Sequence, residues 1–126
     1  MNLKQQYPAS KELIETGIRQ QVGDAVFILS YYYSSKAQIF FHSELQRLKN
    51  SMDPADAVLA AMRSTLVKCV VLGWENLQED DVTLIYSKEE CERILNTYEG
   101  LDVLLMEKSL DIINFKEACD KEILGN

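Results

Sequence analysis

The chain has 126 residues, 47% of them hydrophobic, and a formal net charge of −7 at pH 7. This length and composition suffice for one buried core, which argues against a chain that is disordered throughout. The acidic charge argues against non-specific binding to nucleic acid or to an anionic membrane, because both need clustered lysine and arginine. We therefore expect a single domain, residues 1–126, with neither nucleic acid nor membrane as a partner.

The N-terminal part predicts a loose arm over residues 1–15 and a β-hairpin over residues 16–33. Gly23-Asp24 forms the turn, and the run after it, from Ala25 to Tyr33, is rich in β-branched and aromatic residues that favour strands. A lone two-stranded hairpin is marginally stable in water. We expect it to pack on helices or to join the sheet of a neighbouring subunit.

A helical body is predicted over residues 34–119. Ser34 or Ser35 can cap its first helix, because a serine hydroxyl accepts from backbone N–H groups that lack a helical partner. The apolar residues that follow have helical spacing, and the helix should end near Asn50. They are Ala37, Phe40, Phe41, Leu45 and Leu48.

The second helix should begin at Asp53-Pro54, which combines an acceptor at the cap with a residue that needs no N–H bond. We expect it to run through the apolar segment to Leu72 and to end at Gly73. Trp74 is expected in the core as a wedge between two helical halves. The predicted buried stripe consists of Val58, Leu59, Met62, Leu66, Cys69 and Val70.

Two further helices complete the helical body. Ser87 and Glu90 match a capping box for a helix up to Tyr98, with Cys91, Ile94, Leu95 and Tyr98 buried, and Gly100 breaks it. The last helix should run from Leu101 to about Cys119, with apolar residues on more than one face. Residues 120–126 are expected as a frayed tail. The predicted fold class is mainly α, a small helical domain with a short N-terminal β-hairpin.

Side chains that could carry chemistry are few. The three cysteines have no metal-ligand spacing and fit reduced core thiols, and the single histidine, His42, has no evident partner for acid–base work. The acidic loop around Asp80-Asp81 lacks the alternating ligands of a calcium loop. No Gly-rich phosphate loop or nucleophile motif occurs. We expect no catalytic residue, no metal and no cofactor, and so no enzyme.

The run Tyr31-Tyr32-Tyr33 has two interpretations. In a strand, alternate tyrosines face opposite sides, so one side would be buried and the other exposed. Exposed tyrosine is common at protein interfaces, whereas stacking on nucleic acid would lack an electrostatic attraction in so acidic a chain. The alternative is a mixture of core and scattered surface residues.

The order of motifs between Ala25 and Phe115 resembles tail assembly chaperones of long-tailed (siphophage-type) bacteriophages or prophages. The most specific part is a Gly-Trp corner at Gly73-Trp74-Glu75-Asn76, followed by the helix start Tyr86-Ser87. Many relatives have an Asp-Gly turn after the tryptophan, and Asp80-Asp81-Val82 stands in its place here. The resemblance also includes Ser34-Ser35, Asp53-Pro54, Leu95, Leu101–Leu105 and Asn114-Phe115.

This resemblance implies a function. Such chaperones bind the tape measure protein, a long helical chain, and keep it soluble in the host bacterial cytoplasm until tail tube protein polymerises around it. Many are made in two lengths through a ribosomal frameshift, which implies a longer form of this chain as a further partner, and a homo-oligomer on the client. The alternative is a small helical protein-binding adaptor or regulator without chaperone activity.

Excess apolar area selects candidate residues for self-association or client contact. A helix with more apolar residues than one face can bury offers the remainder to a partner. The candidates are Tyr31, Tyr33, Phe40, Leu104, Ile112 and Phe115.

Overall fold

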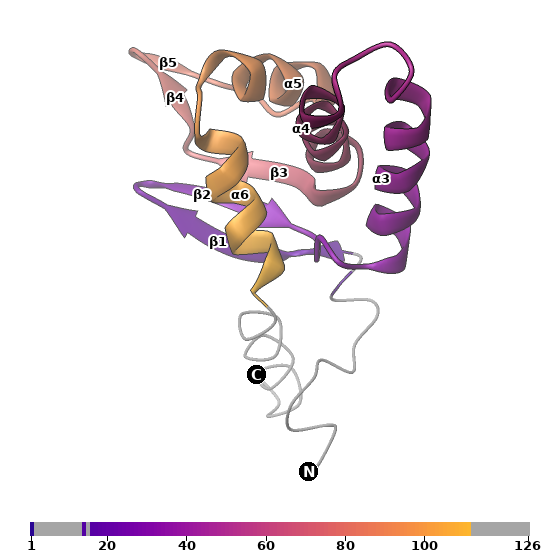
Figure 1. Cartoon of the computed structure of the whole chain (residues 1–126). Coiled ribbons are helices and arrows are strands. Elements are labelled where there is room, and N and C mark those ends of the chain that lie inside the picture. Colours follow the sequence, from indigo (N-terminus) through magenta and orange to yellow (C-terminus); the bar gives the residue numbers. More distant parts are fainter. Residues whose placement is uncertain (2–13, 15, 112–126) are drawn as a thin grey trace.

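A computed structural model describes Met1, Ile14 and residues 16–111. The expected arm over residues 1–15 lies almost wholly outside the described residues, as do the end of the last expected helix and the expected tail. The elements appear in Figure 1. They are β1 (Ile18–Val22), β2 (Ala25–Leu29), α3 (Ser35–Leu48), α4 (Pro54–Thr65), the π-helical turn η1 (Leu66–Val70), β3 (Val71–Glu75), β4 (Gln78–Glu79), β5 (Val82–Thr83), α5 (Lys88–Thr97) and α6 (Leu101–Leu110).

The fold is mixed α/β, so the predicted mainly α class is wrong. β3 pairs antiparallel with β2 and completes a three-stranded sheet in the order β1-β2-β3. A second antiparallel pair, β4–β5, follows where only an acidic loop was expected. The predicted N-terminal hairpin is confirmed as β1–β2, and it is stabilised by a third strand of its own chain.

The error arises at the end of the second helix. α4 ends at Thr65, and one π-helical turn follows, closed by the N–H of Val71 donating to the carbonyl of Leu66. From Val71 the backbone is extended. A short apolar run rich in valine fits a buried strand as well as a buried helix, and periodicity alone does not separate the two.

Gly73 is a strand residue and not the expected helix terminator. It lies opposite Ile28 on β2. A Cβ atom at this position would lie 3.2 Å from Cδ1 of Ile28, closer than ordinary van der Waals contact. The missing side chain therefore permits the isoleucine to pack across the strand, a use of glycine where a neighbour approaches closely.

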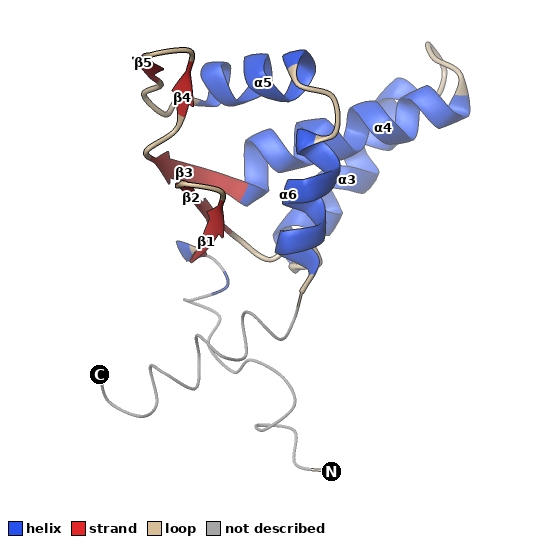
Figure 2. Cartoon of the chain, turned by 90° about the vertical axis from the view of Figure 1, so that its left-hand side faces the viewer, coloured by secondary structure: helices blue, strands red, loops and turns tan. Residues whose placement is uncertain are grey.

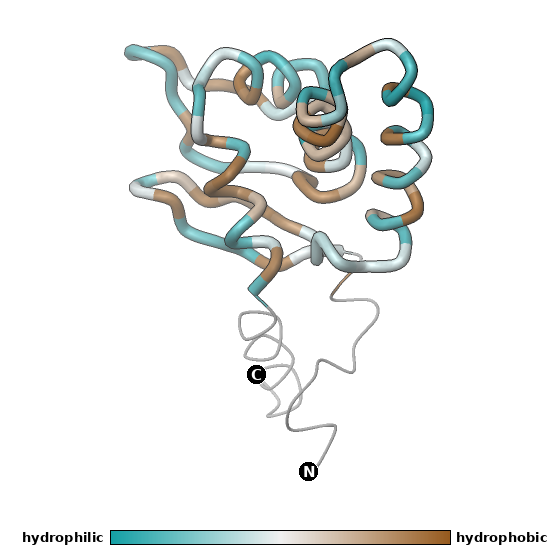
Figure 3. Tube along the Cα trace, in the orientation of Figure 1, coloured by the Kyte–Doolittle hydropathy of each residue, from teal (hydrophilic) through white to brown (hydrophobic). Residues whose placement is uncertain are grey.

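One face of the sheet forms the floor of the core. Phe27 and Leu29 of β2 and Trp74 of β3 are buried there, and α3, α4 and α6 lie on the same side of the sheet (Figure 2). The predicted core position of Trp74 is confirmed, but on a strand. Along the chain, apolar residues concentrate in β2, η1 and β3, which meet in the middle of the molecule (Figure 3).

Strand β2 ends at Leu29, four residues earlier than expected. Tyr31, Tyr32 and Tyr33 form the turn into α3, where Ser34 caps the helix by accepting from the N–H of Ala37 at 3.2 Å. Tyr32 is buried and Tyr33 is 58% exposed. Neighbouring tyrosines thus face opposite sides as predicted, but they do so in a turn, and the predicted strand over these residues is wrong.

The stripe predicted on α4 is partly wrong. Val58 and Leu59 are each 46% exposed, whereas Ala57 and Ala61 are fully buried against α3. Alanines let the two helices approach closely, so small residues occupy the contact that larger ones were expected to fill. The first half of α4 therefore presents large apolar side chains to solvent.

The C-terminal helices follow the prediction more closely. Ser87 accepts from the N–H of Glu90 at 3.0 Å, and Gly100, with φ +94°, separates α5 from α6. Cys91, Ile94 and Leu95 are buried as expected, but Tyr98 is 44% exposed. Tyr98 lies outside the core because α5 ends at Thr97. The ring of Tyr98 is beside the β4–β5 pair, and its hydroxyl donates to Glu79 on β4.

Candidate partner-binding surfaces

The tyrosine turn is the first surface that the sequence singled out. The rings of Tyr31 and Tyr33 are T-shaped with centroids 6.1 Å apart, and both line a cavity of about 570 Å³ in front of α3. Tyr32 is held beneath them, because its N–H donates to the carbonyl of Ser109 on α6 at 3.0 Å. Burial raises the pKa of Tyr32 to about 12, so its hydroxyl is neutral at ordinary pH.

The other predicted contact residues lie elsewhere. Phe40 is half-buried and packs against the core from α3, so most of its ring has a structural role. Leu104 is 37% exposed on the outer side of α6, next to Val103 at 43%. Ile112 and Phe115 lie outside the described residues. The structure thus brings Tyr31 and Tyr33 together and places Leu104 on a different element.

Several exposed apolar side chains were not predicted as contact residues. Ile39 on α3 is 70% exposed, and the region of the small hairpin exposes Val82 at 64% and Ile85 at 84%. Val58 and Leu59 are exposed as well, so large apolar side chains meet solvent on α3, on α4 and beside β5. The sequence carried a signal for the last of these, since Ile85 follows an acidic loop and precedes a helix cap, where no core element is expected.

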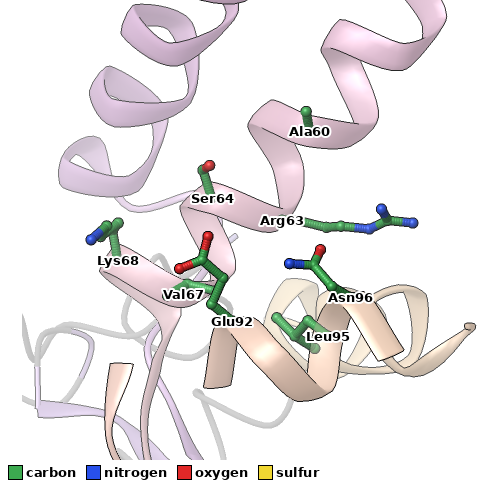
Figure 4. A pocket seen from close by; sticks show the side chains of 8 residues that line it. All are labelled: Ala60, Arg63, Ser64, Val67, Lys68, Glu92, Leu95 and Asn96. Carbon is green, nitrogen blue, oxygen red and sulfur yellow. The ribbon is translucent and has the colours of Figure 1, made fainter. Parts of the chain in front are cut away.

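A groove lined mainly by polar side chains lies between α5 on one side and α4 and η1 on the other (Figure 4). Its volume is about 190 Å³, and Ala60, Arg63, Ser64, Val67, Lys68, Glu92, Leu95 and Asn96 line it. Charged groups of both signs share this small space. Such a lining suits contacts between the helices better than the burial of an apolar partner.

Arg63 leads from this groove to α6. Its Nε donates to Oδ2 of Asp102 at 2.7 Å, and the carboxylate also accepts from the N–H of Val103 at 2.8 Å. Burial would raise the pKa of Asp102, but these hydrogen bonds outweigh it and lower the pKa below the usual value. Asp102 is therefore a charged, fully bonded group that fixes the start of α6.

A second groove is apolar and lies between the β4–β5 pair, the C-terminal end of α5 and the first residue of α6. We name it the hairpin groove. Its volume is about 240 Å³. It is lined by Leu77, Gln78, Glu79, Leu84, Ile94, Tyr98 and Leu101.

Polar contacts tie the two sides of the hairpin groove together. Glu79 on β4 accepts from Nη2 of Arg93 on α5 at 3.0 Å and from the hydroxyl of Tyr98. The hydrogen bonds from Arg93 and Tyr98 lower the pKa of Glu79, so it stays charged. Beneath the groove, the indole N–H of Trp74 donates to the carbonyl of Leu84 at 2.9 Å.

Two further observations bear on the kind of site. Within residues 16–111 and at Ile14, no three histidine, cysteine or acidic side chains come together so as to hold a metal ion. In the same part of the chain, no helix has the length and apolar character needed to cross a membrane.

The comparison with known families concerns the same part of the fold. A family model described as YdaY prophage protein matches residues 35–126. The chain belongs to this family. No curated protein and no solved structure matches it. The prophage origin implied by the resemblance is therefore confirmed.

Some of the candidate surfaces lie inside the part of the chain that the family model matches, and one lies outside it. The matched part begins at the first residue of α3, so both grooves lie within it and the turn of Tyr31 and Tyr33 precedes it. The exposed side chains of Ile39, Ile85 and Leu104 all belong to the matched part.

Proposed function

We propose that this YdaY-family prophage protein is a tail assembly chaperone that binds the tape measure protein and keeps it soluble in the host bacterial cytoplasm. It would act by binding and not by catalysis. The observation that carries the proposal is the exposure of large apolar side chains on several elements of a small acidic chain, among them Ile39, Val58 and Ile85. Apolar areas on an otherwise polar surface are typical of interaction sites.

The mechanism follows from these two properties. A long helical client exposes apolar stripes until its partners assemble around it, and burial of those stripes on the chaperone removes them from water. The net charge of −7 then keeps the complexes apart, because like-charged particles repel one another. Apolar contact and acidic charge thus have separate roles.

Further partners are part of the proposal. Several copies would line one client, which makes a homo-oligomer on the client part of the proposal. A head-to-tail contact between copies gives an open spiral and not a closed dimer, and a spiral can follow a long chain. Tail tube protein would displace these copies, and a frameshift-extended form of the chain would join them.

The test is co-expression with the very long reading frame of the same prophage tail cluster. We expect the client to be insoluble alone, to become soluble with this chain and to elute with it from a sizing column. Client that is equally soluble alone and forms no complex would contradict the proposal. It would favour a protein-binding adaptor without chaperone activity.

A control removes the apolar surface without unfolding the chain. Ile39→Asp and Leu59→Asp change exposed positions on α3 and α4, so the thermal unfolding of the chaperone should stay close to that of the wild type. Loss of client solubility with an intact fold would separate a binding role from a general effect on expression.

A further inference from the structure

We propose that the hairpin groove receives a bulky apolar side chain from a helix of the client, and that this helix carries lysine or arginine on the neighbouring turns. The inference rests on the proposed function, in which the client is a long helical protein. It adds the place of contact and the chemistry that the client needs there.

The apolar part of the argument comes from the lining. Leu84 and Leu101 are partly exposed in the groove, and Ile94 is buried beneath it. The hairpin groove has a volume of about 240 Å³, which is below the roughly 300–1,000 Å³ typical of small-molecule sites. A single large side chain is a better match for this space, in the way that one buried anchor dominates many interfaces.

Two exposed apolar side chains belong to the segment that carries Leu84 of the groove lining. Ile85 is 84% exposed and Val82 is 64% exposed, although neither contributes to the core. A helix whose anchor enters the groove would cover both side chains with its own apolar stripe.

The charge around the groove identifies the partner. Asp80 and Asp81 are exposed at the tip of the β4–β5 turn, and Glu99 is exposed after the end of α5. Asp80 directly follows Glu79 and Glu99 directly follows Tyr98, two residues of the lining, so these charges lie at the rim. The nearby cation, Arg93, is already paired with Glu79 and Glu90. The acidic rim therefore selects a basic helix.

The groove is also held in shape before any partner arrives. The N–H of Leu84 donates to the carbonyl of Leu77 at 2.8 Å, and Trp74 holds the carbonyl of Leu84. Glu79 links β4 to Arg93 on α5. A preformed site loses less conformational entropy on binding, which favours affinity.

Trp74 makes the groove observable. It is the single tryptophan of the chain, so its indole N–H gives one resonance that needs no assignment in a spectrum of ¹⁵N-labelled chaperone. That N–H is bonded to Leu84 in the groove lining. We would titrate the labelled chain with overlapping synthetic 20-residue peptides that cover the tape measure protein.

We expect the peptides that bind to be basic and amphipathic and to shift the Trp74 indole resonance as they saturate. Ile85→Asp and Val82→Asp should weaken their binding at least tenfold. Asp80→Asn with Asp81→Asn should weaken it several-fold at low salt and have little effect at high salt, because exposed charges are screened. Asparagine accepts the positive φ of residue 80, so the turn is kept.

Matched controls remove similar groups elsewhere. Met52→Asp places the same charge on an apolar side chain that is 40% exposed between α3 and α4, and Asp56→Asn with Glu107→Gln removes two exposed charges that do not line the groove. Both should leave the affinity for the groove peptides within twofold of the wild type.

The outcomes separate the two proposals. If peptides bind but the Trp74 resonance does not move and Ile85→Asp binds as the wild type does, the groove is not the contact, and the chaperone function stands. If no peptide of the tape measure protein binds, the proposed function fails and the inference fails with it. Peptides that bind at the groove but are acidic would overturn the stated client chemistry.

Discussion

Arg63 and Asp102 join α4 to α6 through a hydrogen bond of 2.7 Å between Nε and Oδ2. The side chain of Asp102 is only 4% exposed, whereas that of Arg63 is 37% exposed. The pair therefore consists of a buried carboxylate and a guanidinium that is still in contact with water. It fixes the first turn of α6, beside which Val103 and Leu104 face solvent.

Replacement of Arg63 by methionine should destabilise the fold, because it leaves a buried carboxylate without its main partner. We expect a loss of about 1–3 kcal/mol in the free energy of unfolding, less than for a fully buried pair because the arginine is part-exposed. Urea unfolding measures it. Arg19→Met is the control, since both side chains of its pair with Glu75 are more than half exposed, and its effect should be clearly smaller. Equal losses in both variants would contradict the structural role of Asp102.

The acid side of the stability profile should depend on Asp102. Its pKa is lowered in the folded chain, so the unfolded state binds the proton more readily. The wild type should keep this contribution above the unfolded pKa of about 3.9 and lose it as the pH falls through the lower folded value. Asp102→Asn lacks it at every pH. The difference between the two unfolding free energies should therefore narrow below pH ~4, and a constant difference would contradict the lowered pKa.

Trp74 should contribute to stability in two separable ways. Trp74→Ala removes the ring that contacts Phe27 and Tyr86 and should cost about 3–5 kcal/mol. Trp74→Phe keeps an aromatic ring but leaves the carbonyl of Leu84 without its donor, and should cost about 1–3 kcal/mol. Thermal and urea unfolding test both. Unchanged stability in Trp74→Ala would exclude a core role.

Gly73 and Ile28 should behave as a coupled pair. Gly73→Val places a branched side chain where a Cβ atom is already 3.2 Å from Cδ1 of Ile28, so we expect a loss of about 1–3 kcal/mol from overpacking. Ile28→Val removes that methyl group. The double variant should recover part of the loss, which a double-mutant cycle would show as a coupling free energy. Strict additivity would mean that the close contact is not the cause.

Leu104→Asp tests the outer side of α6 as a contact surface. The side chain is 37% exposed, so the fold should tolerate the charge, while client solubility or oligomer size should decrease if this face binds. The fraction of soluble tape measure protein gives the client solubility, and sizing chromatography gives the oligomer size. If neither changes, Leu104 is a surface residue without a role in assembly. Glu107→Gln, on an exposed position of the same helix, is the control.

The helix starts could be predicted because their signals are local. Ser34, Asp53 and Ser87 each cap a helix in the structure as the sequence indicated. The third strand could not be predicted, because its formation depends on pairing with residues that are distant in the sequence. Val71 and Gly73 form a strand only where β2 offers a free edge, and the residues of β2 precede them by more than forty positions.

The candidate surfaces were predicted less well. Tyr33 and Leu104 are exposed as expected, but Phe40 is mainly a packing residue. The hairpin groove was missed because its lining comes from β4, the segment before α5, and two helices, which only the fold brings together. The exposure of Ile85 had a local signal, its position between an acidic loop and a helix cap, but the prediction of contact residues did not use it.

The pairing of β2 with β3 sets an order on events during synthesis. Val26 is opposite Glu75, so the N-terminal hairpin has no third strand until the ribosome has released almost fifty further residues. α3 and α4 lie between them and contact each other over a short stretch of chain, so they can form first. The helical pair can therefore form while the edge of β2 is still unpaired, and β3 joins that edge afterwards.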